Sequence, residues 1–446
     1  MTTGRPTTLA LNGMVASPHY LASAAGLRVL TDGGSAMDAA VTTNAVLTVI
    51  YPDQTSIGGD CLLLGYNSAT QTLHGLNGSG RAPAAANAQR IREAGHKRMP
   101  RDGIETVTVP GTIDAWDVAL TRFGRFGLDR ALQPAINYAR DGFPVSPRLS
   151  AAITTQREAL DVSETLRRLY LPRGMPPNPG DRLRLPELAH TLELIARDGR
   201  DAFYEGSIGE KIGATAAQLG GALTLADLAA HRAEWVEPIQ TEYRGVQVAT
   251  MPPNSQGLTA LLGLNLLKQV ARGKSWGTAH HLHPMIEAKK LAFAVRDRNL
   301  ADPNCVPIDT ERFLSREFAA ELWRLFNLQQ ALRGAPEQVG DTVFVCAVDR
   351  DGNAVALIQS MYQGFGSRVA VGDTGVLLHN RGTNFSLEPG HPNELAGGKR
   401  PLHTLMPAIL LRDGALLGPI GTQGGDAQAQ VLMQLVSNLI DFDMEP

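Results

Sequence analysis

The sequence predicts a globular protein of α/β class with both helices and strands. Of its 446 residues, 43% are hydrophobic and 19% are charged, which is enough apolar material for a large buried core. The 46 glycines and 27 prolines indicate many tight connections between elements. Some stretches have apolar residues at helical spacing and others form short β-prone runs, so a mixed fold is expected.

Two helices and a hairpin are predicted near the N-terminus. Helical periodicity covers residues 19–30 and 35–51, and the second helix is small or apolar on nearly every face, which predicts that it is buried. Strand-like runs at 61–66 and 72–76 flank a turn at Asn67-Ser68. Strands are therefore expected early in the chain.

The middle of the chain is predicted to be mainly helical. Helical periodicity dominates residues 111–236, for instance over 128–141, with proline-rich loops between the helices. A strand segment is predicted next, at residues 240–251, and two helices follow at 258–270 and 286–300. Residues 333–340 have no periodicity and are predicted to form an exposed loop.

A second predicted hairpin follows that loop. Apolar, β-prone runs at 341–348 and 354–360 flank Asp351-Gly352, a dipeptide typical of tight hairpin turns. If these two residues form the whole loop, Thr342 lies opposite Ser360 or the residue after it. Two hydroxyl side chains are therefore expected to face each other at the open end of this hairpin.

Thr342 is the candidate nucleophile. If the chain is cut between Asp341 and Thr342, the new α-amine can act as the base for the threonine's own hydroxyl, because an unperturbed α-amine has a pKa of about 7.7–8.0. Ser360 is the second hydroxyl of this site. The alternative interpretation is that Thr342 is an ordinary β-branched strand residue.

The C-terminal part contains a candidate oxyanion hole. Short strands are predicted at 374–378, 408–411 and 416–420, and a helix at 427–440 with Asp426 near its start. Gly424-Gly425 lies between the last strand and this helix, where backbone N–H groups can point at an anion. The alternative is a plain turn that needs backbone freedom.

Composition argues against several partner classes. The net charge is −3, with 41 basic and 44 acidic residues and no run of like charges, so neither nucleic acid nor a membrane surface is an expected partner. The N-terminal residues lack an apolar signal segment, which predicts a cytoplasmic protein. A small molecule is the expected substrate.

No metal or cofactor is predicted. The three cysteines, Cys61, Cys305 and Cys346, are far apart, which argues against both a disulfide framework and a cysteine-rich zinc site. His280, His283 and Glu287 could share a helix face, but no further ligand cluster accompanies them.

Several motifs, spread along nearly the whole chain, together resemble the γ-glutamyltransferase family of N-terminal nucleophile hydrolases. The motifs that carry the resemblance are Gly33-Gly34-Ser35-Ala36-Met37-Asp38-Ala39-Ala40, Gly58-Gly59-Asp60, Val109-Pro110-Gly111-Thr112, Tyr138-Ala139-Arg140-Asp141-Gly142-Phe143, Glu287-Ala288-Lys289-Lys290-Leu291-Ala292-Phe293-Ala294, Phe365-Gly366-Ser367, Lys399-Arg400-Pro401-Leu402 and Gly424-Gly425.

The resemblance implies a fold, a cleavage and an assembly. The expected fold is a four-layer αββα sandwich of two mainly antiparallel sheets between helices. Self-cleavage between Asp341 and Thr342 would give segments 1–341 and 342–446, which stay together as a heterodimer; a homodimer of such heterodimers is a further arrangement. Ser360 matches the hydroxyl beside the nucleophile, and Gly424 with Gly425 match the oxyanion donors. No cofactor is implied.

The predicted substrate pocket departs from the γ-glutamyl pattern. Asn384 stands where the family has an aspartate for the substrate α-amine, and His403-Thr404 stands where it has two serines for the α-carboxylate. Ala88 occupies the position of a carboxylate-binding arginine, with Arg90 close by. A neutral amide cannot form the charge-assisted bond of a carboxylate to an ammonium group, so γ-glutamyl specificity is not expected.

The chain is more similar to the acylase and amidohydrolase branch, which includes cephalosporin acylases and oxamate amidohydrolase. The similar stretches are Ser360-Met361-Tyr362, Asn380-Arg381-Gly382, His403-Thr404 and Gly421-Thr422-Gln423-Gly424-Gly425-Asp426. Arg381 and His403 are predicted to bind a substrate carboxylate, with Tyr362, Asn384 and Thr404 beside them. The alternatives are a structural ion pair for Arg381 and a hydrogen-bonded core histidine for His403.

The predicted activity is amide hydrolysis through an acyl-enzyme on Thr342. Two alternatives stay open: a glutathione hydrolase or γ-glutamyltransferase, and an uncleaved, non-catalytic member of the family. The second rests on the C-terminus, because family members normally continue with further strands beyond the helix that ends near Asp443, whereas this sequence stops at Pro446. A missing strand would leave a sheet edge unpaired.

Overall fold

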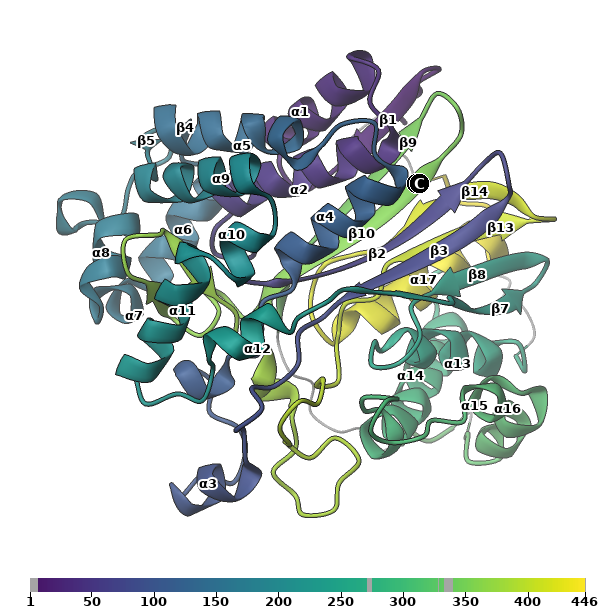
Figure 1. The fold of residues 1–446 in the computed structure, drawn as a ribbon. Helices are drawn as coiled ribbons and strands as arrows, with labels where there is room; N and C mark the ends of the chain where they lie inside the picture. Colours follow the sequence, from purple (N-terminus) through teal and green to yellow (C-terminus); the bar gives the residue numbers. More distant parts are fainter. Residues whose placement is uncertain (1–6, 271–274, 328, 333–339, 446) are drawn as a thin grey trace.

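Two antiparallel sheets form the centre of the molecule (Figure 1). The computed structural model describes residues 7–270, 275–327, 329–332 and 340–445. The larger sheet has the order β1-β9-β10-β2-β3-β6, made of Gly13–Ala16, Asp341–Asp349, Ala354–Tyr362, Asp60–Asn67, Thr72–Gly78 and Glu234–Val236. The smaller has the order β14-β13-β8-β7, made of Ala415–Ile420, Ala408–Arg412, Val246–Thr250 and Ile239–Tyr243.

The two sheets pack face to face through apolar side chains. Leu64 and Ala356 of the larger sheet belong to the same buried cluster as Ala249 and Ile409 of the smaller one. Every residue of β10 is buried, as expected for a strand with neighbours on both sides and layers on both faces. The end of β10 is therefore well shielded from water.

Helices cover the outer face of each sheet, which completes the predicted four-layer αββα arrangement (Figure 1). The helices on the larger sheet's side are α1 (Tyr20–Thr31), α2 (Ala36–Ile50), α4 (Thr112–Phe123), α5 (Leu128–Asp141), α6 (Pro147–Thr155), α7 (Arg157–Asp161), α8 (Glu164–Tyr170), α9 (Pro186–Asp198), α10 (Asp201–Tyr204), α11 (Ser207–Gln218) and α12 (Leu225–Ala229). Those on the smaller sheet's side are α13 (Gly257–Leu267), α14 (Ala279–Asn299), α15 (Thr310–Leu314), α16 (Arg316–Trp323) and α17 (Ala427–Asp441).

Short elements complete the chain. They are α3 (Ala88–Glu93), the 3-10 turns Ile104–Thr106, Pro172–Gly174 and Arg381–Asn384, and two small strand pairs, β4 (Phe143–Pro144) with β5 (Arg182–Leu183) and β11 (Val369–Val371) with β12 (Val376–Leu378). Within the described ranges, no helix is both long and apolar enough to cross a membrane.

Most predicted elements have the expected type. The helix α2 is buried along its whole length, and Ser35 starts it with a capping box to Asp38. The predicted strand 240–251 is instead two strands, β7 and β8, because Arg244 and Gly245 form a turn with positive φ between them. The predicted loop at 333–340 lies outside the described residues except for Gly340.

The β9–β10 hairpin is present, but its loop has three residues rather than two. Asp349 N–H donates to the Asn353 carbonyl at 3.0 Å, and Gly352 takes the left-handed conformation with φ of 83°. The register shifts again between Gln359 and Tyr362. The three-residue loop by itself places Thr342 across from Ser360, one of the two predicted partners, and the irregularity follows that pair, before Tyr362 meets Asp341.

Candidate active site

The open end of the β9–β10 hairpin brings the predicted hydroxyls together at an intact Asp341–Thr342 peptide. Thr342 Oγ1 lies 3.4 Å from Ser360 Oγ, and Thr342 is only 1% exposed. Ser360 Oγ also donates to the carbonyl oxygen of Asp341 and accepts from the Tyr362 N–H at 2.6 Å. One serine hydroxyl therefore contacts both the candidate nucleophile and the carbonyl of the predicted cleavage site.

A buried loop between α2 and β2 holds the other side of Thr342. The Thr342 N–H donates to Gln54 Oε1 at 3.1 Å. Gln54 Nε2 donates to Asp53 Oδ2 at 2.8 Å, and Arg148 forms an ion pair with this Asp53 carboxylate at 2.8 Å. Burial raises the pKa of Asp53, and Arg148 opposes that shift. No motif in the sequence indicated a role for these three residues.

The predicted glycine pair forms the turn before α17, and both glycines have positive φ, 119° at Gly424 and 57° at Gly425. A Cβ on Gly425 would lie 2.8 Å from the Cα of Gly340, so the turn packs directly against the segment that precedes Asp341. The absence of side chains lets these two backbones approach. The turn and the predicted cleavage site are therefore neighbours.

A buried network fixes this turn from behind. Gln256 Nε2 donates to the Gly425 carbonyl at 3.0 Å, while Gln256 Oε1 accepts from Arg296 at 2.8 Å. Arg296 also pairs with Asp426 at 2.8 Å. Burial alone would lower the pKa of Arg296, but Asp426 and Asp297 outweigh it and raise the pKa. The Asp426 carboxylate therefore pairs with Arg296 and does not accept a capping hydrogen bond from the first turn of α17.

Arg381 is a fully buried cation near the end of β10. Its Nη1 donates to Thr404 Oγ1 at 2.9 Å, and its guanidinium lies over the Tyr362 ring at 4.4 Å. Its Nε and Nη2 have no hydrogen-bond partner among the described residues. Burial lowers the pKa of Arg381 to about 10, against the opposing charge of Asp60, so it stays charged at neutral pH. Two N–H-bearing nitrogens are thus available to an anion.

His403 is a hydrogen-bonded core histidine. Its Nε2 lies 3.0 Å from Asp60 Oδ2, and its Nδ1 accepts from the Leu405 N–H at 3.2 Å. Burial and the Arg381 charge lower the pKa of His403 to about 3, so it is neutral. Burial acts to raise the pKa of Asp60, but His379, His403 and Arg381 together lower it to about 2. With both ring nitrogens engaged, His403 serves Asp60 rather than an incoming carboxylate.

Asn384 lies apart from this buried cluster and lines a cavity of about 310 Å³. Its Nδ2 donates to the Leu402 carbonyl at 3.0 Å. The same cavity is lined by Arg296 and Asp426, the pair that supports the glycine turn. The cavity therefore reaches the back of the predicted oxyanion hole. Arg90, which sequence placed near the family's arginine position, does not line it.

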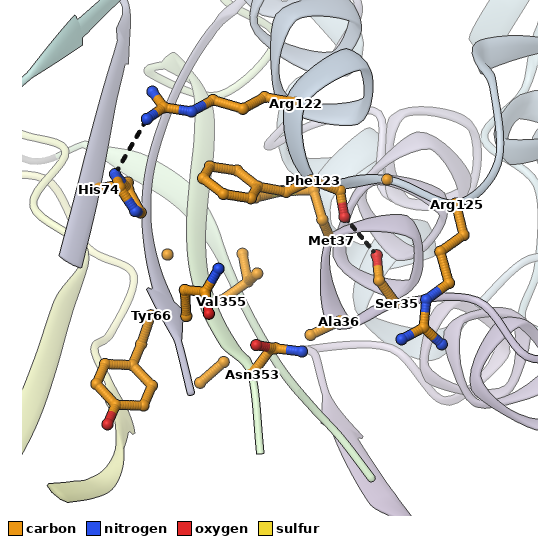
Figure 2. A pocket seen from close by; sticks show the side chains of 14 residues that line it. Ser35, Ala36, Met37, Tyr66, His74, Arg122, Phe123, Arg125, Asn353 and Val355 are labelled. Atoms are coloured by element: carbon orange, nitrogen blue, oxygen red, sulfur yellow. Dashed lines mark hydrogen bonds between the residues drawn. The ribbon is translucent and has the colours of Figure 1, made fainter. Parts of the chain in front are cut away.

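A second cavity, of about 260 Å³, lies at the opposite, turn end of the β9–β10 hairpin (Figure 2). Its lining includes Asn353 and Val355 from the start of β10. Arg122 points toward His74, with 3.4 Å between Nη2 and Nδ1. None of the predicted site residues lines this cavity.

Two of the three histidines of α14 make local contacts. His283 Nε2 is 2.9 Å from the Asn327 carbonyl, and the His281 ring packs on Phe442. The buried Glu287 carboxylate pairs with Lys290 at 2.7 Å and accepts from the Leu332 N–H. In the part of the chain that the structure describes, no group of three or more histidine, cysteine or acidic side chains has a metal-binding arrangement.

Known proteins resemble this chain along nearly its whole length. The family model of gamma-glutamyltranspeptidase matches residues 22–446. The chain is 42% identical to the glutathione hydrolase-like YwrD proenzyme of Bacillus subtilis, over 97% of this chain and 82% of the relative. It is 36% identical to the oxamate amidohydrolase proenzyme of Klebsiella pneumoniae, over 96% of this chain and 82% of the relative.

A solved structure from the acylase branch has the same fold as this chain. The crystal structure of cephalosporin acylase from Bacillus halodurans superposes with a TM-score of 0.94 and 39% identity, and the match covers 100% of this chain and 84% of that one. The fold is that of the N-terminal nucleophile hydrolases, a class of enzymes. The chain belongs to the gamma-glutamyltranspeptidase family.

Proposed function

We propose that this protein is a self-processing amide hydrolase that cuts itself between Asp341 and Thr342 and then uses Thr342 as its N-terminal nucleophile. The observation that carries this proposal is the Ser360 hydroxyl, which contacts both the Thr342 hydroxyl and the Asp341 carbonyl oxygen. The two relatives are named as proenzymes, and these names support the proposal that this chain is cleaved to give its active form.

The cleavage needs only groups that meet at this peptide. Thr342 Oγ attacks the Asp341 carbonyl carbon while the Ser360 hydroxyl donates to the carbonyl oxygen and stabilises its developing charge. The C–N bond breaks as the Thr342 nitrogen takes the proton that Oγ gives up and leaves as an amine, and Asp341 is left as an ester on Thr342 Oγ. Water then hydrolyses this ester and frees both the Asp341 carboxyl group and the Thr342 hydroxyl.

The same groups would then act on an external amide. The free α-amine takes the proton from Thr342 Oγ as the hydroxyl attacks the substrate carbonyl, and it passes that proton to the leaving amine. The N–H groups of the Gly424-Gly425 turn hold the oxyanion once Gly340, which packs against Gly425 in the uncut chain, has moved away. Water releases the acyl group from Thr342.

The sheet order supports a heterodimer after cleavage. Strands β9 and β10 of segment 342–446 lie between β1 and β2 of segment 1–341, and β13 pairs with β8. The two segments thus share both sheets and their cores. Cutting one peptide bond leaves these contacts in place, so the fragments are expected to stay associated.

The environment of Arg381 favours a substrate whose acyl group carries a carboxylate. It is the buried cation beside Tyr362, and two of its nitrogens are without partners in the described structure. A carboxylate would satisfy both through charge-assisted hydrogen bonds. The neutral Asn384, in place of a carboxylate, gives no charge to hold a substrate α-amine, which places γ-glutamyl transfer second.

A substrate panel with two Thr342 variants tests the proposal. Thr342→Ala should remain a single uncut chain without amidase activity, because it lacks the nucleophile. Thr342→Ser keeps a hydroxyl and should still be cut. In the wild type, glutaryl and oxamate amides should be hydrolysed faster than γ-glutamyl-p-nitroanilide. A Thr342→Ala protein that is cut and active would falsify the mechanism. A wild type that prefers the γ-glutamyl substrate would instead favour the second candidate function, γ-glutamyl transfer or hydrolysis.

A further inference from the structure

Gln54 occupies a position next to the nucleophile that the proposed mechanism leaves without a role. It is 3% exposed and its side chain spans two groups, the Thr342 nitrogen and the Asp53 carboxylate. In the intact chain, that nitrogen is the amide nitrogen of the predicted scissile bond. After cleavage it would be the α-amine that serves as the base.

The loop that carries Gln54 is tied to the end of β10 by its backbone. The Met361 N–H donates to the Gln54 carbonyl at 3.1 Å, and the Phe365 N–H donates to the Asp53 carbonyl at 2.9 Å. One residue before Ser360, Gln359 reaches back to the Ser56 carbonyl. The loop and the nucleophile therefore form one rigid unit, which fixes the distance between Gln54 and Thr342.

The Asp53–Arg148 pair determines which end of the Gln54 amide faces Thr342. A carboxylate only accepts hydrogen bonds, so the Gln54 NH₂ group must point at Asp53 and Oε1 must point at Thr342. Arg148 holds the Asp53 carboxylate with two contacts, at 2.8 and 3.0 Å, and its guanidinium stacks on Tyr51 at 4.2 Å. The orientation of Gln54 is thus set by a charged pair behind it.

We propose that Gln54 is a positioning residue that holds the amino group of Thr342 through Oε1 and so orients the base of the reaction. This proposal rests on the function proposed above. An amine bonded to Oε1 through one N–H has its lone pair restricted to the remaining directions, one of which faces Thr342 Oγ1 on the same residue. Gln54 accepts a hydrogen bond throughout and neither gains nor loses a proton.

Two substitutions separate positioning from folding. Gln54→Leu removes the acceptor, and kcat should fall about 10- to 100-fold with KM little changed, because Gln54 orients the base and does not bind substrate. Gln54→Glu keeps an oxygen near the amine but adds a negative charge that favours the protonated amine. The acid limb of the kcat/KM profile should then move to higher pH, by about 1 unit or more, since the base must be unprotonated to act.

Gln359→Leu is the matched control. Gln359 is also a buried glutamine tied to this loop, but it contacts Ser56 and Thr112 rather than Thr342. Its loss should lower the melting temperature without moving the acid limb. Each protein is produced from the full-length chain. Denaturing gels and N-terminal sequencing first measure the extent of cleavage, and the activity assays follow.

The outcomes separate this proposal from the proposed function. A wild type that is never cut before Thr342 ends the proposed function itself. If the wild type is cut, a normal kcat in Gln54→Leu or an unmoved acid limb in Gln54→Glu overturns only the role of Gln54. A Gln54→Leu chain that folds with a normal melting temperature but is cut more slowly supports the role, because Gln54 holds the scissile N–H. A large loss of melting temperature in both variants would assign Gln54 to folding.

Discussion

The two ends of the β9–β10 hairpin use buried polar groups in different ways. At the turn end, Asp349 Oδ1 accepts from the N–H groups of Asp351 and Asn353, both at 3.0 Å, and Oδ2 accepts from the Ala36 N–H at 3.1 Å. At the other end, Arg381 has two nitrogens without partners in the described structure. The turn end is satisfied internally, whereas the nucleophile end is left able to bind something else.

The difference shows where chemistry is expected. A buried polar group without a partner costs free energy, so its persistence needs an explanation outside folding. The strand ladder is also interrupted between Gln359 and Tyr362, and this irregularity aims the Ser360 hydroxyl at the Asp341 carbonyl. Substitutions at the two ends should therefore have different effects, on activity at one end and on stability at the other.

Among substitutions at the two ends of the hairpin, the largest loss of activity is expected at Arg381. In Arg381→Met, kcat/KM for a glutaryl amide should fall about 10- to 100-fold, since charge-assisted hydrogen bonds contribute about 1.5–3 kcal/mol. The matching butyryl amide, which lacks the carboxylate, should lose much less. Steady-state kinetics on both substrates measure the difference. An equal loss on both would mean that Arg381 supports the site without binding the carboxylate.

A smaller effect concerns pH and arises at the nucleophile end. His403 has a pKa of about 3 in the fold, because burial and Arg381 disfavour its protonation, against about 6.5 when unfolded. The unfolded chain therefore binds a proton that the folded chain does not, and stability falls as pH drops from about 6.5 toward 3. The slope from this residue is at most about 1.4 kcal/mol per pH unit.

Urea unfolding at pH 7 and pH 5 measures this loss. The loss should be reduced in His403→Gln, which removes the titrating ring, although that variant starts from a lower stability. An unchanged pH dependence in the variant would show that other groups cause the acid sensitivity.

The smallest effect is expected at the turn end. Asp349→Asn replaces a charged acceptor that serves several N–H groups, so it should lower the free energy of unfolding by about 1 kcal/mol. Self-cleavage and kcat should not change, because Asp349 lies at the far end of the hairpin from Thr342. Urea unfolding and the amidase assay together check both statements. A lower kcat in fully folded Asp349→Asn would remove the contrast between the two ends.

Sequence patterns predicted the architecture well for physical reasons. The alternation and turn residues of the hairpin, and the small or apolar residues on nearly every face of α2, are local signals, and both elements are present. The three-residue loop was missed because a dipeptide such as Asp351-Gly352 does not specify how many residues leave the ladder. The irregularity after Ser360 depends on contacts from other elements, such as the hydrogen bond from the Met361 N–H to the Gln54 carbonyl.

Local sequence could not reveal residues that act through distant contacts. Gln54 meets Thr342 across 288 positions of sequence, and Gln256 meets Gly425 across 169. Nothing in the neighbourhood of either glutamine indicates a partner so far away. Asp60 was part of the Gly58-Gly59-Asp60 motif, but its contact with His403 depends on how the two central sheets pack. Arg381 keeps two nitrogens without partners in the described structure and His403 has both ring nitrogens engaged, a difference in hydrogen bonding that the sequence does not show.

N-terminal sequencing of the purified, incubated protein tests the central claim most directly. The proposed mechanism predicts two fragments that copurify, the smaller beginning Thr342-Val343-Phe344-Val345. A single intact chain, or a cut at any other bond, would contradict it.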